Sequence, residues 1–266
     1  MIQAVIFDMG GVIHTLTEDP NRHLLYAGKI KDLLELRGIR IPDPVEVFAN
    51  KLLEADHARK RAAEQTGEIP PIEAWRSFFL KDYGATSEQL FPISEELSFL
   101  WCNRAHDTPR EGLRECLQGL REQGMRLGIL SNTLSRTYAP YFLQEYGVAG
   151  YFEYILLSSV CGLRKPDARI FDLCRTSMGL KAEEMAYVGD TISRDVIGVK
   201  NAGWALMIRI LFREAKAHVL EREQKLEGCG YAPDYVIEKL PEIADIIRSY
   251  NEGCHIGRVS SGKKEV

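Results

Sequence analysis

Short apolar runs alternate with helix-like segments through much of this 266-residue chain, and this alternation limits the folds open to it. One run opens the chain, and five more follow after position 125. They cover residues 3–7, 126–130, 154–158, 185–188, 205–210 and 235–237. Strands that alternate with helices in this way form a parallel sheet covered by helices. We therefore predict an α/β core made of residues 1–16 and 107–250.

The segment between the first two runs has a different pattern. In residues 17–106, apolar side chains recur at helical spacing, as at Leu24 and Ile30. Prolines and glycines divide this segment into about four helices, and Ser94, followed by two glutamates, is typical of a helix start. We therefore predict an all-helical insert whose aromatic side chains form a core of their own.

Two further segments have simple interpretations. The basic run Arg59, Lys60 and Arg61 is predicted to be a solvated helix face. Residues 251–266 have little apolar content and three glycines, so we expect them to form a mobile tail.

The composition argues against several classes of protein. The chain has 38 acidic and 34 basic residues, a net charge of −4, and 45% hydrophobic residues. A chain of this size can bury a core without disulfides or a structural metal. Its acidic balance argues against a nucleic-acid binder, which needs a basic face for phosphates. No apolar stretch approaches the roughly 20 residues of a membrane helix.

The cellular setting can also be predicted. The first residues lack the basic region, apolar block and cleavage site of a signal peptide. The six cysteines form no C-x-x-C pair and show no zinc-ligand spacing, which is typical of a reduced compartment. We therefore expect a cytoplasmic protein with no membrane segment and no nucleic-acid partner. No pattern indicates an oligomeric state.

Polar residues follow four of the apolar runs, at the end where ligands bind in open parallel sheets. The first run ends at Asp8, and the second ends at Ser131 and Asn132. Lys165 follows the third run, and Asp190 follows the fourth. Taken singly, each of these is equally typical of a turn, a helix cap or a solvated surface.

Their joint order is far more specific. A second aspartate, Asp195, comes five residues after Asp190. A carboxylate, then Ser-Asn, Lys-Pro and Gly-Asp with a later aspartate, resembles the haloacid-dehalogenase-like hydrolase superfamily. The resemblance covers roughly the whole chain, and residues 165–203 match the third and fourth family motifs almost continuously. It implies a Rossmann-like parallel sheet flanked by helices, with the insert at 17–106 as the helical cap of a subfamily I phosphatase.

The resemblance also implies roles for the residues at the strand ends. Asp8 would be the nucleophile that forms an aspartyl-phosphate, which water then hydrolyses. Ser131 and Asn132 would hold phosphate oxygens, and Lys165 would neutralise charge on the transferred group. Asp195 would orient Lys165 or a water molecule beside the metal. The implied catalytic residues are therefore Asp8, Ser131 and Lys165.

A metal site is implied at the same edge of the sheet. The nucleophile and the phosphate are both negative, and a bound Mg²⁺ would remove the repulsion between them. The resemblance implies that Asp8, Asp190 and the carbonyl of Gly10 hold this ion, and such hard oxygen ligands suit Mg²⁺. We therefore expect a Mg²⁺-dependent phosphatase that acts on a small phosphorylated metabolite.

Two positions depart from the family pattern. Most phosphatases of this superfamily have a second aspartate, the acid and base of the reaction, where this chain has Gly10. The loss of such a group typically costs about 10²- to 10⁴-fold in rate. His14 is the nearest titratable candidate for the missing acid, and an ordinary, partly exposed histidine is the alternative. Arg194 stands where the family often has asparagine, and the sequence assigns it no role.

Three other functions stay open at this point. A metal-independent haloacid dehalogenase of the same superfamily also lacks the second aspartate, although Asp190 favours the phosphatase. A phosphonate hydrolase relies on a cap lysine, for which Lys29, Lys31 and Lys51 are available. A non-catalytic regulatory relative would have lost turnover together with the acid. No G-x-G-x-x-G, Walker-type or G-x-S-x-G motif indicates an oxidoreductase, a nucleotide-binding protein or a serine hydrolase.

Overall fold

A computed structural model describes residues 1–211, 221, 223–226 and 230–253 of the chain, apart from the side chains of residues 65 and 66. Its main sheet has six parallel strands in the order β5-β4-β1-β6-β7-β8. They are β1 (Ala4–Phe7), β4 (Arg126–Ser131), β5 (Tyr154–Leu157), β6 (Met185–Gly189), β7 (Leu206–Ile210) and β8 (Tyr235–Ile237). Each predicted strand is confirmed to within one residue at either end.

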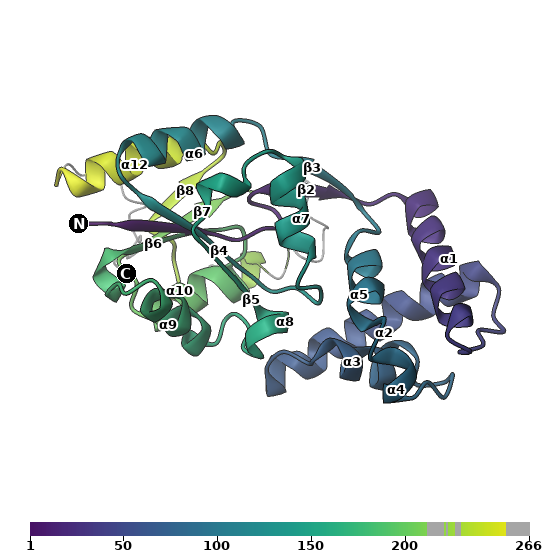
Figure 1. Cartoon of the computed structure of the whole chain (residues 1–266). Helices are drawn as coiled ribbons and strands as arrows, with labels where there is room; N and C mark the ends of the chain where they lie inside the picture. The colour runs from purple at the N-terminus through teal and green to yellow at the C-terminus, as the bar shows by residue number, and fades with distance from the viewer. Residues whose placement is uncertain (212–220, 222, 227–229, 254–266) are drawn as a thin grey trace.

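Helices cover both faces of this sheet (Figure 1). On one face lie α6 (Leu113–Glu122) and α12 (Glu242–Asn251), and on the other lie α9 (Ala168–Ser177) and α10 (Ile197–Asn201). Two shorter helices, α7 (Tyr138–Glu145) and α8 (Ser158–Cys161), follow β4 and β5. The architecture is therefore the predicted Rossmann-like α/β fold.

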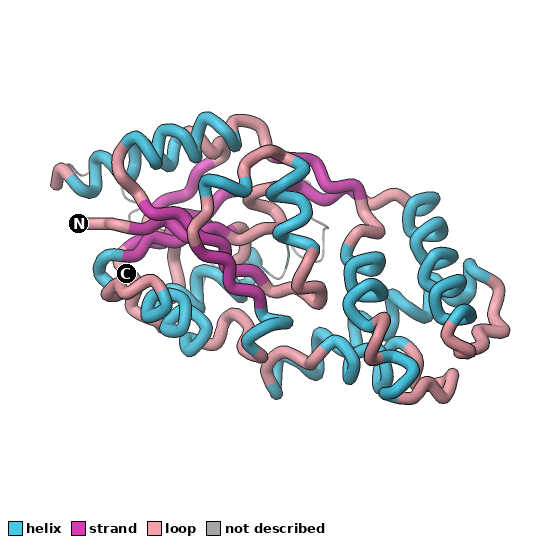
Figure 2. The backbone as a smooth tube through the Cα atoms, viewed as in Figure 1, coloured by secondary structure: helices cyan, strands magenta, loops and turns pink. Residues whose placement is uncertain are grey.

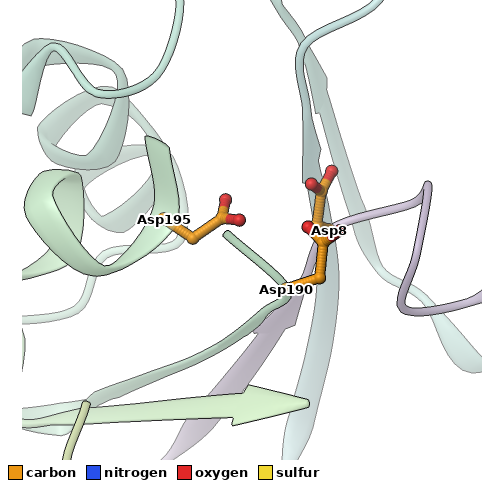
Figure 3. Close-up of side chains that lie close together, drawn as sticks. All are labelled: Asp8, Asp190 and Asp195. Atoms are coloured by element: carbon orange, nitrogen blue, oxygen red, sulfur yellow. The ribbon is translucent and has the colours of Figure 1, made fainter. Parts of the chain in front are cut away.

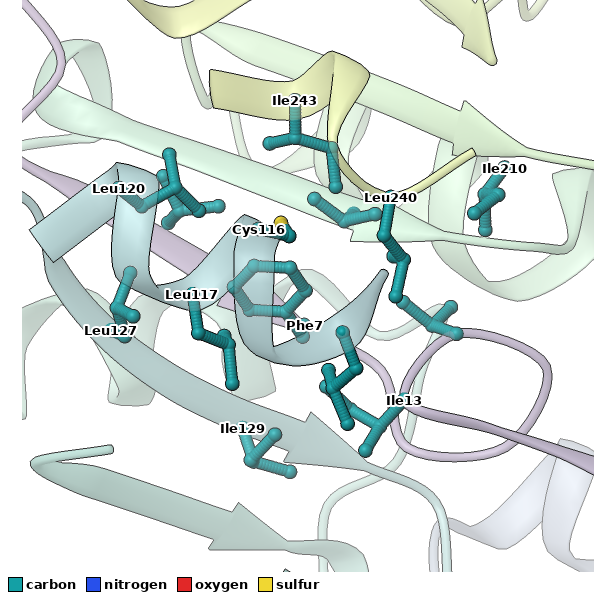
Figure 4. Packing of buried hydrophobic residues seen from close by; sticks show 14 of the residues in the cluster. Phe7, Ile13, Cys116, Leu117, Leu120, Leu127, Ile129, Ile210, Leu240 and Ile243 are labelled. Atoms are coloured by element: carbon teal, nitrogen blue, oxygen red, sulfur yellow. The ribbon is translucent and has the colours of Figure 1, made fainter. Parts of the chain in front are cut away.

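Separate apolar clusters hold the two faces. Phe7 of β1 lies against the α6 and α12 face, with Leu117 of α6 and Ile243 of α12 in the same buried cluster (Figure 4). Ile6 points the other way, into a cluster with Phe171 of α9 and Val199 of α10. Successive strand residues face opposite sides, so a strand buried on both faces is apolar throughout. This explains why β1 reads AVIF without a polar position.

The insert forms a helical domain beyond the carboxyl end of β1 (Figure 2). Its helices are α1 (Pro20–Leu36), α2 (Val45–Thr66), α3 (Pro71–Ala74), α4 (Ser87–Leu90) and α5 (Ser94–Cys102), with a π-helical turn at Trp75–Phe79. The predicted helix start at Ser94 is confirmed. Trp75, Phe79 and Trp101 form an apolar cluster with the insert helices, as predicted for its aromatic residues, whereas Phe91 is 75% exposed.

Two strands outside the main sheet were not predicted. β2 (His14–Thr17) and β3 (His106–Pro109) pair antiparallel, with His14 opposite Pro109 and Thr17 opposite His106. Their sequences, HTLT and HDTP, are mostly polar and exposed, so no apolar alternation marks them as strands. Both connections between the core and the insert run through this ribbon.

The predicted tail begins in ordered structure. Asn251 is the last residue of α12, and its side-chain amide exchanges hydrogen bonds of 2.6 and 3.1 Å with the backbone of Ile2. Residues 254–266 lie outside the described residues. The same holds for Cys229 and Cys254, while Cys102, Cys116, Cys161 and Cys174 are free thiols. In the part of the chain that is described, no helix combines the length and apolar content needed to cross a membrane.

Candidate active site

The register of the sheet brings three aspartates together. Phe7 is in register with Ile129 of β4 and Val188 of β6, so Asp8 follows β1 at the point where both neighbouring strands end. Asp8 N–H donates to Val188 O at 2.9 Å and fixes this position. One carboxylate oxygen each from Asp8, Asp190 and Asp195 lies within 4.8 Å of the others. Figure 3 shows the three carboxylates converging from different segments.

Lys165 is the cation of this cluster. Its ammonium lies 2.9 Å from Asp8 Oδ2 and 2.6 Å from Asp195 Oδ1, and its side chain is only 1% exposed. It also donates a hydrogen bond of 2.7 Å to the Tyr187 hydroxyl. Three oxygen partners thus satisfy the three donors of the ammonium. The predicted site residues Asp8, Lys165 and Asp195 therefore form one connected group.

Ser131 and Asn132 lie beside this group in different ways. Ser131 ends β4 and is largely buried. The Asn132 side chain accepts from Lys165 N–H at 2.9 Å and donates to Lys165 O at 3.0 Å. Because both amide atoms are engaged with the Lys165 backbone, the Asn132 side chain positions this lysine. Only its backbone remains for the role in phosphate binding that the resemblance implies.

A glycine makes room for Asp190. Gly11 has φ +78°, and a Cβ atom placed there would lie 2.4 Å from Asp190 Oδ2. No real Cβ tolerates this approach, and positive φ also disfavours other residues. The glycine after Gly10 is therefore required both by the turn after β1 and by the carboxylate that packs against it.

The charge state of the aspartates follows from burial and neighbouring charges. Burial, with the negative charges of Asp195 and Asp8, raises the pKa of Asp190 to about 7. Burial acts in the same direction on Asp195, but the cations Lys165 and Arg194 outweigh it and lower the Asp195 pKa. Asp190 Oδ1 is buried without a hydrogen-bond partner among the described residues. An unpartnered carboxylate oxygen in a cluster of three aspartates suits a hard divalent cation.

Two residues of this centre escaped the sequence analysis. Thr191 donates to Asp195 Oδ2 from its backbone N–H at 3.0 Å and from its hydroxyl at 2.7 Å. Tyr187 donates to Leu130 O at 3.0 Å, and burial raises its pKa well above the usual value, so the hydroxyl stays protonated. A tyrosine in a strand buried on both faces needs a partner for its hydroxyl, and this signal could have identified Tyr187.

The space beside Gly10 is apolar. Its φ is not positive, and a Cβ added there would lie 3.2 Å from the Leu16 Cδ1 atom of β2. The missing carboxylate of the family pattern is thus replaced by a leucine side chain close to the backbone. A larger residue at position 10 requires only that the end of this flexible side chain shifts.

His14 is not a partly exposed histidine. It is completely buried, with its ring near Tyr138, Phe142 and Tyr146, and burial lowers its pKa to about 4. Its Nδ1 lies 3.0 Å from the Tyr146 hydroxyl, and its Nε2 lies 3.7 Å from Asp107 Oδ1. The ring belongs to the core beneath the β2–β3 ribbon. No contact connects it with the aspartate cluster, so the geometry does not support His14 as the missing acid.

The insert contacts the core beside the site. Glu68, between α2 and α3, accepts hydrogen bonds from Ser158 Oγ at 2.6 Å and Arg164 Nη1 at 3.1 Å. Arg59 of α2 donates to the other Glu68 oxygen at 3.0 Å. The expectation of a solvated face is wrong for Arg59, which is buried between Glu68 and Asp56. Spacing alone cannot reveal such pairing, because the partners come from other segments.

A second contact is made by Glu95 of α5. Its carboxylate accepts from Ser135 Oγ at 2.6 Å, Thr137 N–H at 3.0 Å and Arg136 N–H at 3.2 Å. This segment follows Asn132 and leads into α7. Both contacts therefore tie the insert to loops that carry predicted site residues.

Known proteins share both the sequence pattern and the fold. The family model of haloacid dehalogenase-like hydrolases matches residues 2–203. A glyceraldehyde 3-phosphate phosphatase from Methanopyrus kandleri is 25% identical over 255 residues, which cover 93% of this chain and 98% of that protein.

Two solved structures are similar over nearly their whole length. A HAD phosphatase from Thermococcus onnurineus has a TM-score of 0.58 and 23% identity, covering 92% of this chain and 98% of that one. A 2-haloacid dehalogenase from Pseudomonas syringae pv. Tomato DC3000 has a TM-score of 0.59 and 21% identity, covering 94% and 100%. At these identities the likeness shows the fold alone. The family model, the fold and the order of the strand-end residues agree: the chain belongs to the haloacid dehalogenase-like hydrolase family.

Proposed function

We propose that this protein is a Mg²⁺-dependent phosphatase that hydrolyses a small phosphorylated metabolite through an aspartyl-phosphate. The observation that carries this proposal is the cluster of Asp8, Asp190 and Asp195 around the buried ammonium of Lys165. The M. kandleri relative is named as a phosphatase of a small sugar phosphate, which supports this class of substrate. Its location in the cytoplasm stays a prediction.

The chemistry starts at Asp8. Its carboxylate attacks phosphorus, the bond to the leaving oxygen breaks, and the aspartyl-phosphate is then hydrolysed by water. The Lys165 ammonium, 2.9 Å from Asp8 Oδ2, would stabilise negative charge on the transferred group. Asp195 and Tyr187 hold this ammonium in place, at 2.6 and 2.7 Å. In this role Asp195 is a positioning residue.

A divalent cation would reduce the repulsion between Asp8 and an incoming phosphate. Asp8 and Asp190 are the side chains placed to hold it, and the carbonyl of Gly10 is the backbone ligand that we propose. The buried, unpartnered oxygen of Asp190 fits this role. A metal-independent dehalogenase would leave that oxygen without a purpose, which favours the phosphatase.

Protonation of the leaving group has no obvious donor. Position 10 carries no side chain, Leu16 lies beside it, and His14 is enclosed in the core. We therefore propose that good substrates have leaving groups that depart with little protonation, such as aryl or acyl phosphates.

The cap lysines do not favour phosphonate hydrolysis. Lys29 lies over the Tyr26 ring, at 4.6 Å from its centroid. Lys31 donates to Asp43 O at 2.8 Å, and Lys51 pairs with the Asp43 carboxylate at 2.7 Å. All three ammonium groups are engaged inside the insert, where no Schiff base with a substrate at Asp8 is supported.

A substrate screen tests the proposed function. Purified protein would be assayed on sugar phosphates, acyl phosphates, aryl phosphates, phosphonates and 2-haloacids, with Mg²⁺ and with EDTA, beside Asp8→Asn as the matched inactive variant. We expect phosphate release that EDTA and Asp8→Asn both abolish. Chloride release from a haloacid in EDTA would instead establish a dehalogenase, and no release from any compound would support the non-catalytic alternative.

A further inference from the structure

Arg194 occupies an unusual place beside the catalytic cluster. It lies in a π-helical turn, Ile192–Val196, that follows Asp190. Its Nε donates to Thr191 Oγ1 at 3.3 Å, and the same hydroxyl donates to Asp195 Oδ2 at 2.7 Å. The side chain is partly exposed, and no carboxylate among the described residues lies within ion-pair distance of its guanidinium.

The surrounding charges locate this guanidinium. Although burial opposes its charge, the negative charges of Asp190, Asp195 and Asp8 raise the pKa of Arg194. Arg194 also acts on Arg164, whose pKa is lowered by burial and by nearby cations. Arg164 is the residue that contacts the insert. The guanidinium therefore lies between the aspartate cluster and the contact of the insert with the core.

Neighbouring carboxylates have cations of their own. Glu68 is paired with Arg59 and Arg164, at 3.0 and 3.1 Å. Asp195 is paired with Lys165 at 2.6 Å. Arg194 is therefore a cation without an ion-pair partner, held at the entrance side of a site that already contains Lys165. Such a fixed, partly desolvated guanidinium is suited to bind an anionic group by charge-assisted hydrogen bonds.

We propose that Arg194 determines specificity by binding a second anionic group of the substrate, a carboxylate or a second phosphate, next to the phosphate that Asp8 attacks. The inference rests on the proposed function and names its substrate class: small phosphate compounds that carry another negative group close to the transferred one. A sugar phosphate with an otherwise neutral remainder uses Asp8 and Lys165 but leaves Arg194 unpaired.

Non-hydrolysable probes test this without turnover. Calorimetric titration in excess Mg²⁺ compares methylphosphonate, which has one anionic group, with phosphonoacetate and methylenediphosphonate, which have two. The wild type should bind at least one of the two-anion probes about 10-fold or more tightly than methylphosphonate, as expected for a charge-assisted hydrogen bond. The tighter of the two distinguishes a carboxylate from a second phosphate.

Variants assign the difference to Arg194. Arg194→Gln should remove most of the advantage of the two-anion probe, and Arg194→Lys should retain part of it. Arg169→Gln is the matched control, because Arg169 is an exposed arginine paired with Asp167 on the same domain. Its binding should equal that of the wild type. Equal weakening of all three probes by Arg194→Gln overturns the proposal, as do equal affinities, or no measurable binding of any probe, in the wild type.

Turnover separates this inference from the proposed function. Hydrolysis of an aryl phosphate by the wild type is measured in parallel with binding. Probe binding that depends on Arg194 in a protein that hydrolyses no phosphate ester would refute the phosphatase and leave the binding site established. Efficient hydrolysis with no difference among the probes would refute the role of Arg194 alone.

Discussion

The ammonium of Lys165 lies 2.6 Å from the carboxylate of Asp195, and both side chains are almost completely buried. The pair connects the loop after β5 with the turn after β6, and it holds the ammonium beside Asp8. Removing one charge from a buried pair leaves the other uncompensated, which is strongly destabilising. This relationship makes the catalytic centre part of the stability of the core.

Asp195→Asn should therefore lower the free energy of unfolding by about 2 kcal/mol or more. The neutral side chain removes a charge next to Lys165 and provides one fewer acceptor for Thr191. Denaturant unfolding measures this effect. Asp172→Asn is the control, because Asp172 pairs with Arg175 at 2.7 Å on the surface, and it should change stability by less than about 0.5 kcal/mol. Equal stability of Asp195→Asn and wild type would contradict the expected contribution of the pair.

Gly11→Ala tests the close approach of Asp190. The substitution combines a positive φ with a Cβ only 2.4 Å from Asp190 Oδ2. Gly124→Ala is a matched control, because Gly124 has φ +76° and open space at its Cβ position. Gly124→Ala should cost about 1 kcal/mol from backbone strain, and Gly11→Ala clearly more, since Asp190 must also move. Equal losses of unfolding free energy would show that Asp190 moves aside freely.

The buried His14 and Asp107 oppose each other as the pH falls. Burial lowers the pKa of His14 from 6.5 to about 4, so the unfolded chain binds a proton between these values and the folded protein does not. This weakens the fold in acid. Burial raises the pKa of Asp107 from 3.8 to about 6, so there the folded protein binds the proton, and acid strengthens the fold.

Single substitutions should expose each half of this balance. Relative to wild type, His14→Gln should gain about 2 kcal/mol of unfolding free energy as the pH falls from 6.5 to 4. Asp107→Asn should lose a similar amount as the pH falls from 6 to 4. The double variant should follow the wild-type profile across this range. Parallel pH profiles for both single variants would mean that the two groups do not titrate within it.

Gly10 predicts a dependence on the leaving group. Without a nearby acid, the wild type should hydrolyse aryl and acyl phosphates about 10²-fold or more faster than alkyl phosphates. Gly10→Asp should speed alkyl phosphate hydrolysis by about 10-fold or more, and Gly10→Asn, of similar size but without a proton to donate, should not. Steady-state kcat/KM values measure both effects. Equal wild-type rates for alkyl and aryl substrates would reveal an acid elsewhere.

Patterns local in sequence were predicted, and relationships between distant segments were not. The six strands of the main sheet follow from apolar runs such as AVIF, where burial on both faces leaves no other pattern. β2 and β3 stabilise each other through pairing rather than through apolar content, so their sequences carry no strand signal. Arg59 reads as a surface residue until Glu68, from another segment, lies beside it.

The site shows the same division. The order of Asp8, Lys165, Asp190 and Asp195 along the strands was enough to place them at one edge. The engagement of the Asn132 side chain with the Lys165 backbone depends on the path of a loop, which no motif encodes. Similarly, the burial of His14 depends on aromatic residues of α7, more than a hundred positions away.

The central claim is that Asp8 carries the phosphoryl group during turnover. The most direct measurement quenches the enzyme during hydrolysis of its best phosphate substrate, reduces the acyl phosphate with borohydride, and identifies the modified peptide by mass spectrometry. Position 8 should be converted to homoserine in the wild type and remain unmodified without substrate. Turnover with no conversion at position 8, or conversion at another carboxylate, would contradict the assignment of Asp8 as the nucleophile.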